Sequence, residues 1–353
     1  METLISSLER QLVFSITHAS DVAAARRGGQ QLANDMGFDE TRAGQLAIII
    51  TEVATNIVKH GIAGKVFIGP AQTCIAGIDV IAFDSGPGMD DIDTCLRDGV
   101  SSAGTAGNGL GALARLSDAF DIYSVRDKGA AFFMRLYRAA PDGPRAPRPM
   151  EDRIETGALS LPLAGEDETG DGWAVAIDER GANLLGVDGL GHGPIAAEAT
   201  LAAIEALKKS PSAEPARVVD NAHQVMRATR GAALAAARID FERDEVRFAG
   251  IGNIGACVYD DDGVRRQLVS HNGIVGNNMR KVQEFTLPCA PGALCILHSD
   301  GLSTQWSLEN YPGLQGRHPA LIASVLMRDF ARARDDAMVL VVRRAPGHVR
   351  TSA

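Results

Sequence analysis

The chain has 353 residues, beyond the size at which single cores usually stop growing, so two domains are expected. Its composition, 45% hydrophobic and 22% charged, argues against wholesale disorder. A net charge of −9 disfavours a general nucleic-acid binder, and five scattered cysteines without a C-x-x-C pair predict reduced thiols. With no signal peptide and no apolar run long enough to span a bilayer, a cytoplasmic protein with no membrane partner is expected.

The first half of the chain is predicted to contain a long, largely apolar helix with polar residues along one face. A strand is expected at residues 10–17, and a helix over residues 39–60 that stops at a glycine. Glu52, Asn56 and either Lys59 or His60 recur at spacings of three and four, so they share one face of an otherwise apolar helix. Such a face is usually a solvated stripe, but the two segments that follow favour a functional interpretation.

Two glycine-rich segments follow this helix. A strand at residues 78–83 runs into Asp84-Ser85-Gly86-Pro87-Gly88, which places a carboxylate at a strand end beside a kinked loop. The segment from Gly104 to Gly111 then opens a helix, where backbone N–H groups and the positive end of the helix dipole suit a triphosphate. This segment lacks the lysine and the hydroxyl of a P-loop, which excludes that mechanism.

The helix with Glu52 and Asn56 and the two glycine-rich segments, in this order, resemble the three nucleotide boxes of the GHKL ATPase superfamily. Their context resembles the RsbW/RsbT-type serine kinases of that superfamily, and the resemblance covers residues 8–138. The resemblance implies an α/β sandwich of the Bergerat type, with ATP and Mg²⁺ between helices and a mixed sheet. It implies Asn56 as the Mg²⁺ ligand, Asp84 as acceptor for the adenine amino group, and Glu52 as the base that activates a serine or threonine hydroxyl. The glycines that would shape the base pocket and line the phosphates are Gly86, Gly88, Gly107, Gly109 and Gly111.

A proline-rich stretch at residues 140–149 predicts an extended linker. We therefore expect a GHKL domain at 1–139, a linker at 140–152, a second domain at 153–345 and a tail at 346–353. The second domain is predicted to have alanine-rich helices at 194–208 and 215–229, and strands at 173–177, 183–187, 233–241, 245–250, 255–259, 282–287 and 293–297.

Carboxylates stand at or beside several strand ends of this second domain: Asp171, Asp188, Asp300 and the pair Asp335 and Asp336. Each of them alone is more often a turn residue. Together they offer hard oxygen ligands, which suit Mg²⁺ or Mn²⁺ better than zinc.

The motifs Gly170-Asp171, Asp188-Gly189, Ser299-Asp300-Gly301 and Asp335-Asp336 resemble those of metal-dependent PPM-type protein phosphatases of the SpoIIE/RsbX kind, over residues 153–343. The resemblance implies a β-sandwich flanked by helices that binds two Mn²⁺ or Mg²⁺ ions. It implies that Asp188 bridges the ions together with the Gly189 carbonyl, that Asp300 and Asp335 bind one ion, and that Asp171 organises metal-bound water.

Two questions stay open at this centre. Asp335 and Asp336 are not separated as metal ligands by sequence. His192 could protonate the leaving serine oxygen, although a histidine in the first turn of a helix is more often structural.

Both motif sets in one chain predict a bifunctional bacterial regulator, a serine/threonine kinase and phosphatase acting on STAS-domain anti-sigma-factor antagonists or stressosome proteins in a partner-switching pathway. In the alternative, the N-terminal domain is a non-catalytic ATP-binding switch that sequesters a sigma factor or activates a partner such as a downstream phosphatase. Two inert interaction domains would require both motif sets to be coincidence. The target and the phosphosite stay open, and a homodimer is among the oligomeric states allowed.

Overall fold

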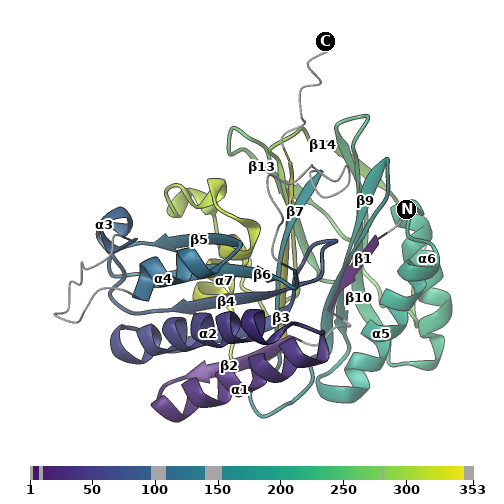
Figure 1. The fold of residues 1–353 in the computed structure, drawn as a ribbon. Helices are drawn as coiled ribbons and strands as arrows, with labels where there is room; N and C mark the ends of the chain where they lie inside the picture. Colours follow the sequence, from purple (N-terminus) through teal and green to yellow (C-terminus); the bar gives the residue numbers. More distant parts are fainter. Residues whose placement is uncertain (1–2, 8–10, 97–108, 140–152, 280–281, 346–353) are drawn as a thin grey trace.

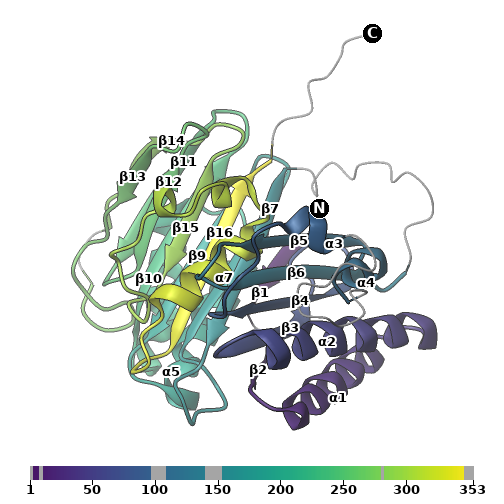
Figure 2. The ribbon, with the colours of Figure 1, turned by 90° about the vertical axis from the view of Figure 1, so that its left-hand side faces the viewer.

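The computed structural model describes residues 3–7, 11–96, 109–139, 153–279 and 282–345. Helices and three sheets stack in layers, shown in two views in Figures 1 and 2. The order of the layers is α5 and α6, a six-stranded sheet, a five-stranded sheet, α7, the N-terminal sheet, and α1 with α2. The predicted linker at 140–152 and the tail at 346–353 lie outside the described residues.

The N-terminal sheet has the strand order β2-β3-β4-β6-β5 and is covered on one face by α1 and α2. Its strands are β2 (Leu12–Ile16), β3 (Gly64–Pro70), β4 (Gly77–Asp84), β5 (Ala119–Ser124) and β6 (Ala130–Tyr137). Its helices are α1 (Ala19–Asp35), α2 (Glu40–His60), α3 (Ile92–Leu96) and α4 (Gly109–Leu116). All four strand pairs are antiparallel, so the expectation of a mixed sheet is wrong. Two of these pairs, β3 with β4 and β5 with β6, are joined by short turns, which allow only antiparallel neighbours.

The second half is a β-sandwich of the sheets β1-β8-β9-β10-β11-β14 and β13-β12-β15-β16-β7. The strands of the first sheet are β1 (Thr3–Ser6), β8 (Asp171–Ile177), β9 (Gly181–Gly189), β10 (Ala232–Asp240), β11 (Glu245–Ile251) and β14 (Phe285–Pro288). Those of the second are β7 (Ile154–Leu161), β12 (Gly255–Tyr259), β13 (Arg265–Leu268), β15 (Leu294–His298) and β16 (Ala337–Arg344). The helices are α5 (Gly193–Lys209), α6 (Pro215–Val225) and α7 (Pro319–Phe330).

The first strand of the chain lies in the second half of the molecule. β1 pairs with β8, with Thr3 opposite Ile177 and Ser6 opposite Ala174. Residues 3–6 therefore belong structurally to the C-terminal sandwich, although they fall within the predicted N-terminal domain at 1–139.

Helix α7 joins the two halves. Every residue from Pro319 to Met327 is buried, because one face packs on β7 and β16 and the other on β4 and β6 (Figure 2). Across the same interface, the Gln72 side chain donates to the Ala158 carbonyl at 2.7 Å and accepts from the Ala158 N–H at 2.6 Å. A helix that is apolar all round, like this one, is expected inside a core.

The five cysteines all lie within the described ranges, and no disulfide joins any two of them there. Over the same ranges, no helix combines the length and apolar character needed to cross a bilayer.

Candidate functional site

The first cluster forms where α2 meets the start of α4. The Asp39 carboxylate caps α2 by accepting from the Arg42 N–H at 2.7 Å, and the predicted helix over residues 39–60 is confirmed. Glu52 and Asn56 are partly buried one turn apart on α2. A Cβ added at Gly109 would lie 3.0 Å from Glu52 Oε2 and 3.7 Å from Asn56 Oδ1, so the N-terminus of α4 faces both side chains.

Asp84 ends β4 and is buried, beside the end of α2. Its Oδ1 accepts the Gly86 N–H at 2.7 Å, and burial raises the pKa of its carboxyl. A Cβ at Gly86 would lie 2.6 Å from the His60 carbonyl oxygen, and Gly88 has φ +70° with its Cβ position 2.3 Å from the Val125 carbonyl oxygen. Both positions therefore require glycine, and the loop holds Asp84 close to the helix that carries Glu52 and Asn56.

Of the remaining nucleotide-box glycines, Gly111 is buried within α4, and Gly107 lies outside the described residues. The structure thus places the described members of all three boxes around the end of β4, α2 and α4.

The second cluster forms where β8 and β9 pair in the sandwich. Their antiparallel register sets Asp171 opposite Asp188. Asp171 is 4% exposed, and its Oδ2 is buried with no hydrogen-bond partner among the described residues. Burial and the charge of Asp188 raise the pKa of Asp171 well above its usual range. Burial, followed by the charges of Asp300 and Asp335, raises the pKa of Asp188 to about 7.

Asp300 follows β15 and completes this group of like charges. Its Oδ2 accepts a hydrogen bond from Asn253 Nδ2 at 2.6 Å, and the next carbonyl, of Gly301, accepts from the Arg332 N–H at 2.7 Å. Burial and the charge of Asp335 raise the pKa of Asp300. Asn253 was not predicted as a site residue from the sequence, because its contact with Asp300 depends on the tertiary fold.

Asp335 and Asp336 have different surroundings in the structure. Asp336 is 2% exposed, and its two carboxylate oxygens accept the N–H groups of Leu163 and Gly170, each at 2.6 Å. Asp335 is exposed, and among the described residues its carboxylate accepts one hydrogen bond, from the Asp336 N–H to Oδ1 at 2.9 Å. The Asp336 carboxylate is thus occupied by backbone donors, whereas that of Asp335 is available to a ligand.

As the side chains stand, no group of three or more His, Cys, Asp or Glu in the described ranges is arranged to hold a metal ion. The donor set nevertheless fits divalent cations by its chemistry. Several carboxylates raise one another's pKa, and one buried oxygen of Asp171 lacks a donor. A bound cation would neutralise the repulsion between the carboxylates and would give the Asp171 oxygen a partner.

His192 is the N-cap residue of α5 and stands beside the carboxylate cluster. Its Nδ1 lies 2.8 Å from Glu166 Oε1, and its side chain is 56% exposed. Gly193 has φ +69°, and a Cβ there would lie 2.9 Å from Glu166 Oε2. Glu166 was not predicted from sequence, because it lies in an acidic run, Glu166-Asp167-Glu168, that is typical of a solvated loop.

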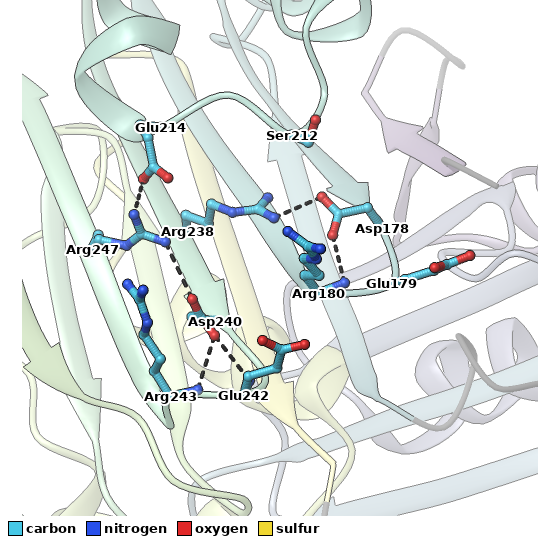
Figure 3. Close-up of a pocket in the computed structure, with 10 residues that line it drawn as sticks. All are labelled: Asp178, Glu179, Arg180, Ser212, Glu214, Arg238, Asp240, Glu242, Arg243 and Arg247. Atoms are coloured by element: carbon cyan, nitrogen blue, oxygen red, sulfur yellow. Dashed lines mark hydrogen bonds and ion pairs between the residues drawn. The ribbon is translucent and has the colours of Figure 1, made fainter.

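A third cluster, of charged residues, lines a cavity of about 530 Å³ at the other end of the first sandwich sheet (Figure 3). Arg238 pairs with Asp178 at 2.8 Å, and Arg247 bridges Glu214 and Asp240. The cavity lies by the start of β9, and Asp188 stands near the end of that strand, about 20 Å away at roughly 3.3 Å per residue. The ion pairs of Arg238 and Arg247 link β8, β10 and β11 at this end of the sheet, so we interpret the cluster as stabilising the sheet.

Two family models match the chain: the histidine kinase-like ATPase domain at residues 15–136 and stage II sporulation protein E (SpoIIE) at residues 178–345. The serine/threonine-protein kinase RsbT of Bacillus subtilis (strain 168) is 38% identical over 112 residues, which are 31% of this chain and 83% of RsbT. The phosphoserine phosphatase RsbX of the same organism is 24% identical over 152 residues, 43% of this chain and 76% of RsbX.

A solved structure, described as a modular bacterial stressosome system adapted to control secondary messenger signalling, is 28% identical with a TM-score of 0.50. It covers 54% of this chain and 100% of its own. The chain therefore belongs to the histidine kinase-like ATPase family through an RsbT-like N-terminal domain, and it carries a SpoIIE-type, RsbX-like phosphatase domain fused behind it.

Proposed function

We propose that the chain sets the phosphorylation level of a protein in both directions, as an ATP-dependent serine/threonine kinase and a metal-dependent serine/threonine phosphatase. The observation that carries the proposal is the presence of both clusters in one folded chain, Glu52 and Asn56 facing Gly109 and Asp171 opposite Asp188. The likeness to a kinase and to a phosphatase supports the same pairing of activities.

In the N-terminal half, Asp84 would accept the adenine amino group and Asn56 would bind the Mg²⁺ that accompanies ATP. Glu52, on the same face of α2, would accept the proton of the attacking serine or threonine hydroxyl. The first N–H groups of α4, near Gly109, point to where phosphate charge would be held. Phosphoryl transfer depends mainly on such positioning and on neutralising charge.

In the C-terminal half, Asp188, the Gly189 carbonyl, Asp300 and Asp335 would hold two Mn²⁺ or Mg²⁺ ions. Such ions lower the pKa of a bound water and neutralise phosphoryl oxygens. Asp171 would orient the attacking water through its free Oδ2.

We assign Asp336 to structure rather than to metal binding, because both of its oxygens already accept backbone N–H groups. His192, held through Nδ1 by Glu166, would donate a proton from Nε2 to the leaving serine oxygen.

The proposed target is a STAS-domain protein of a partner-switching or stressosome pathway, located in the cytoplasm. This choice is supported by the likeness to RsbT and by the match to a structure described as part of a stressosome system.

The test uses one purified chain and two readouts. Transfer of labelled phosphate from ATP to a STAS-domain candidate should occur with the wild type and fail with Glu52→Ala. Mn²⁺-dependent hydrolysis of p-nitrophenyl phosphate should occur with the wild type and fail with Asp188→Ala. Phosphatase activity without any transfer to the candidates would favour the alternative in which the N-terminal half is a non-catalytic ATP-binding switch. Absence of both activities would reject the proposal.

A further inference from the structure

A charged side chain from α7 reaches the nucleotide half of the molecule. The Arg328 side chain is only 2% exposed, and its Nη1 lies 3.4 Å from the Asp84 carbonyl oxygen, to which it donates. Its Nε and Nη2 donate to the two carboxylate oxygens of Asp329 at 2.7 and 2.9 Å. Asp329 in turn accepts a hydrogen bond from the Tyr311 hydroxyl at 2.7 Å. The Arg328 guanidinium is therefore fixed between the Asp329 carboxylate and the Asp84 carbonyl oxygen.

The contact matters because Asp84 is itself buried. Burial raises the pKa of Asp84, while the Gly86 N–H and then the positive charge of Arg328 act in the opposite direction. Screening between two buried groups is weak, so the charge of Arg328 acts on Asp84 more strongly than a surface charge would.

We propose that Arg328 is a positioning residue of the nucleotide site, which fixes the backbone and the charge of Asp84 so that adenine recognition depends on the phosphatase half. The inference rests on the proposed function of Asp84 and concerns purine nucleotides as ligands. Residue 328 lies well outside residues 15–136, which match the ATPase family, so this contact is an addition made by the fused half.

The test is titration calorimetry of Mg²⁺-ADP and Mg²⁺-GDP against the whole chain. In Arg328→Ala, ADP binding should weaken about fivefold or more, since a hydrogen bond to a charged donor near a buried carboxylate is lost. GDP binding should change much less, because Asp84 recognises the amino group of adenine. The preference for ADP over GDP should therefore fall, whereas general loosening of the fold would weaken both nucleotides alike. Arg328→Lys keeps the positive charge but loses the planar guanidinium with its several donors, so its preference for ADP should lie between those of Arg328→Ala and the wild type.

A matched control comes from the other end of the same interface. Arg317 pairs with Asp121 across the two halves at 3.1 Å, away from Asp84, so Arg317→Ala should leave both affinities unchanged. Should Arg328→Ala fail to fold, Arg328→Lys and Asp329→Asn take its place, and both should lower the preference for ADP.

The inference is overturned when a folded Arg328 variant keeps the wild-type preference, or when Arg317→Ala lowers it equally. Asp84→Asn provides the separate arm. Wild-type ADP binding by Asp84→Asn would reject the proposed nucleotide site itself, while loss of binding there with no effect at Arg328 would reject only the role of Arg328.

Discussion

Replacing Asp188 with asparagine should stabilise the metal-free protein while abolishing its phosphatase activity. Asp188 lies opposite Asp171, and burial with the charges of Asp300 and Asp335 raises its pKa from 3.8 to about 7. At about 1.4 kcal/mol per pH unit, this difference amounts to about 4 kcal/mol of folding free energy, taken as an upper value.

The sign follows from which state holds the proton more tightly. Because the pKa is raised in the folded protein, the stabilisation from protonated Asp188 is fully present below pH 3.8 and is lost as the pH rises through about 7. Asparagine does not ionise, so the Asp188→Asn protein does not lose this stability as the pH rises. The advantage of Asp188→Asn over the wild type should therefore be small near pH 4 and grow to a plateau above pH 7.

Urea denaturation in EDTA at pH 4, 6 and 8 measures this difference, and hydrolysis of p-nitrophenyl phosphate with Mn²⁺ measures activity. Asp178→Asn is the control, because Asp178 is a paired carboxylate at the opposite end of β8 and its loss leaves buried Arg238 without its partner. That variant should be less stable than the wild type. An Asp188→Asn protein no more stable than the wild type at pH 8 would refute the argument from charge repulsion.

Three further outcomes are expected. Glu52→Gln should slow phosphate transfer about 100-fold or more while ADP affinity stays unchanged, as calorimetry and transfer rates would reveal; fast transfer would exclude Glu52 as the base. Asp336→Asn should lower the free energy of unfolding by about 2 kcal/mol, because one of the two backbone N–H groups that it accepts loses its acceptor, whereas Asp335→Asn should lose Mn²⁺-dependent activity at unchanged stability. The reverse pattern would exchange the two roles. Starting the chain at residue 8 removes β1 from the sandwich and should lower the melting temperature; an unchanged value would show that the β1–β8 pairing contributes little.

Features encoded locally could be predicted from the sequence. The predicted helix over residues 39–60 matches α2, because its cap, its periodicity and its final glycine all lie within the segment itself. Asp84, Asp171 and Asp188 were expected at strand ends, and each lies at an end of its strand, Asp188 one residue from the end of β9.

Features that depend on contacts between distant segments could not be predicted. α7 has no amphipathic pattern, since it is buried on two sides, and it was not expected as a helix. Whether β1 pairs with β8 is decided by which sheet edge is free to accept it. The same holds for Arg328, which has no sequence signal linking it to Asp84, 244 residues away.

The central claim, opposed activities in one chain, is tested most directly by the steady phosphorylation level of one STAS-domain protein incubated with ATP, Mg²⁺ and Mn²⁺. The account predicts an intermediate level with the wild type, near-complete phosphorylation with Asp188→Asn, and none with Glu52→Gln. An identical level with all three proteins would contradict it.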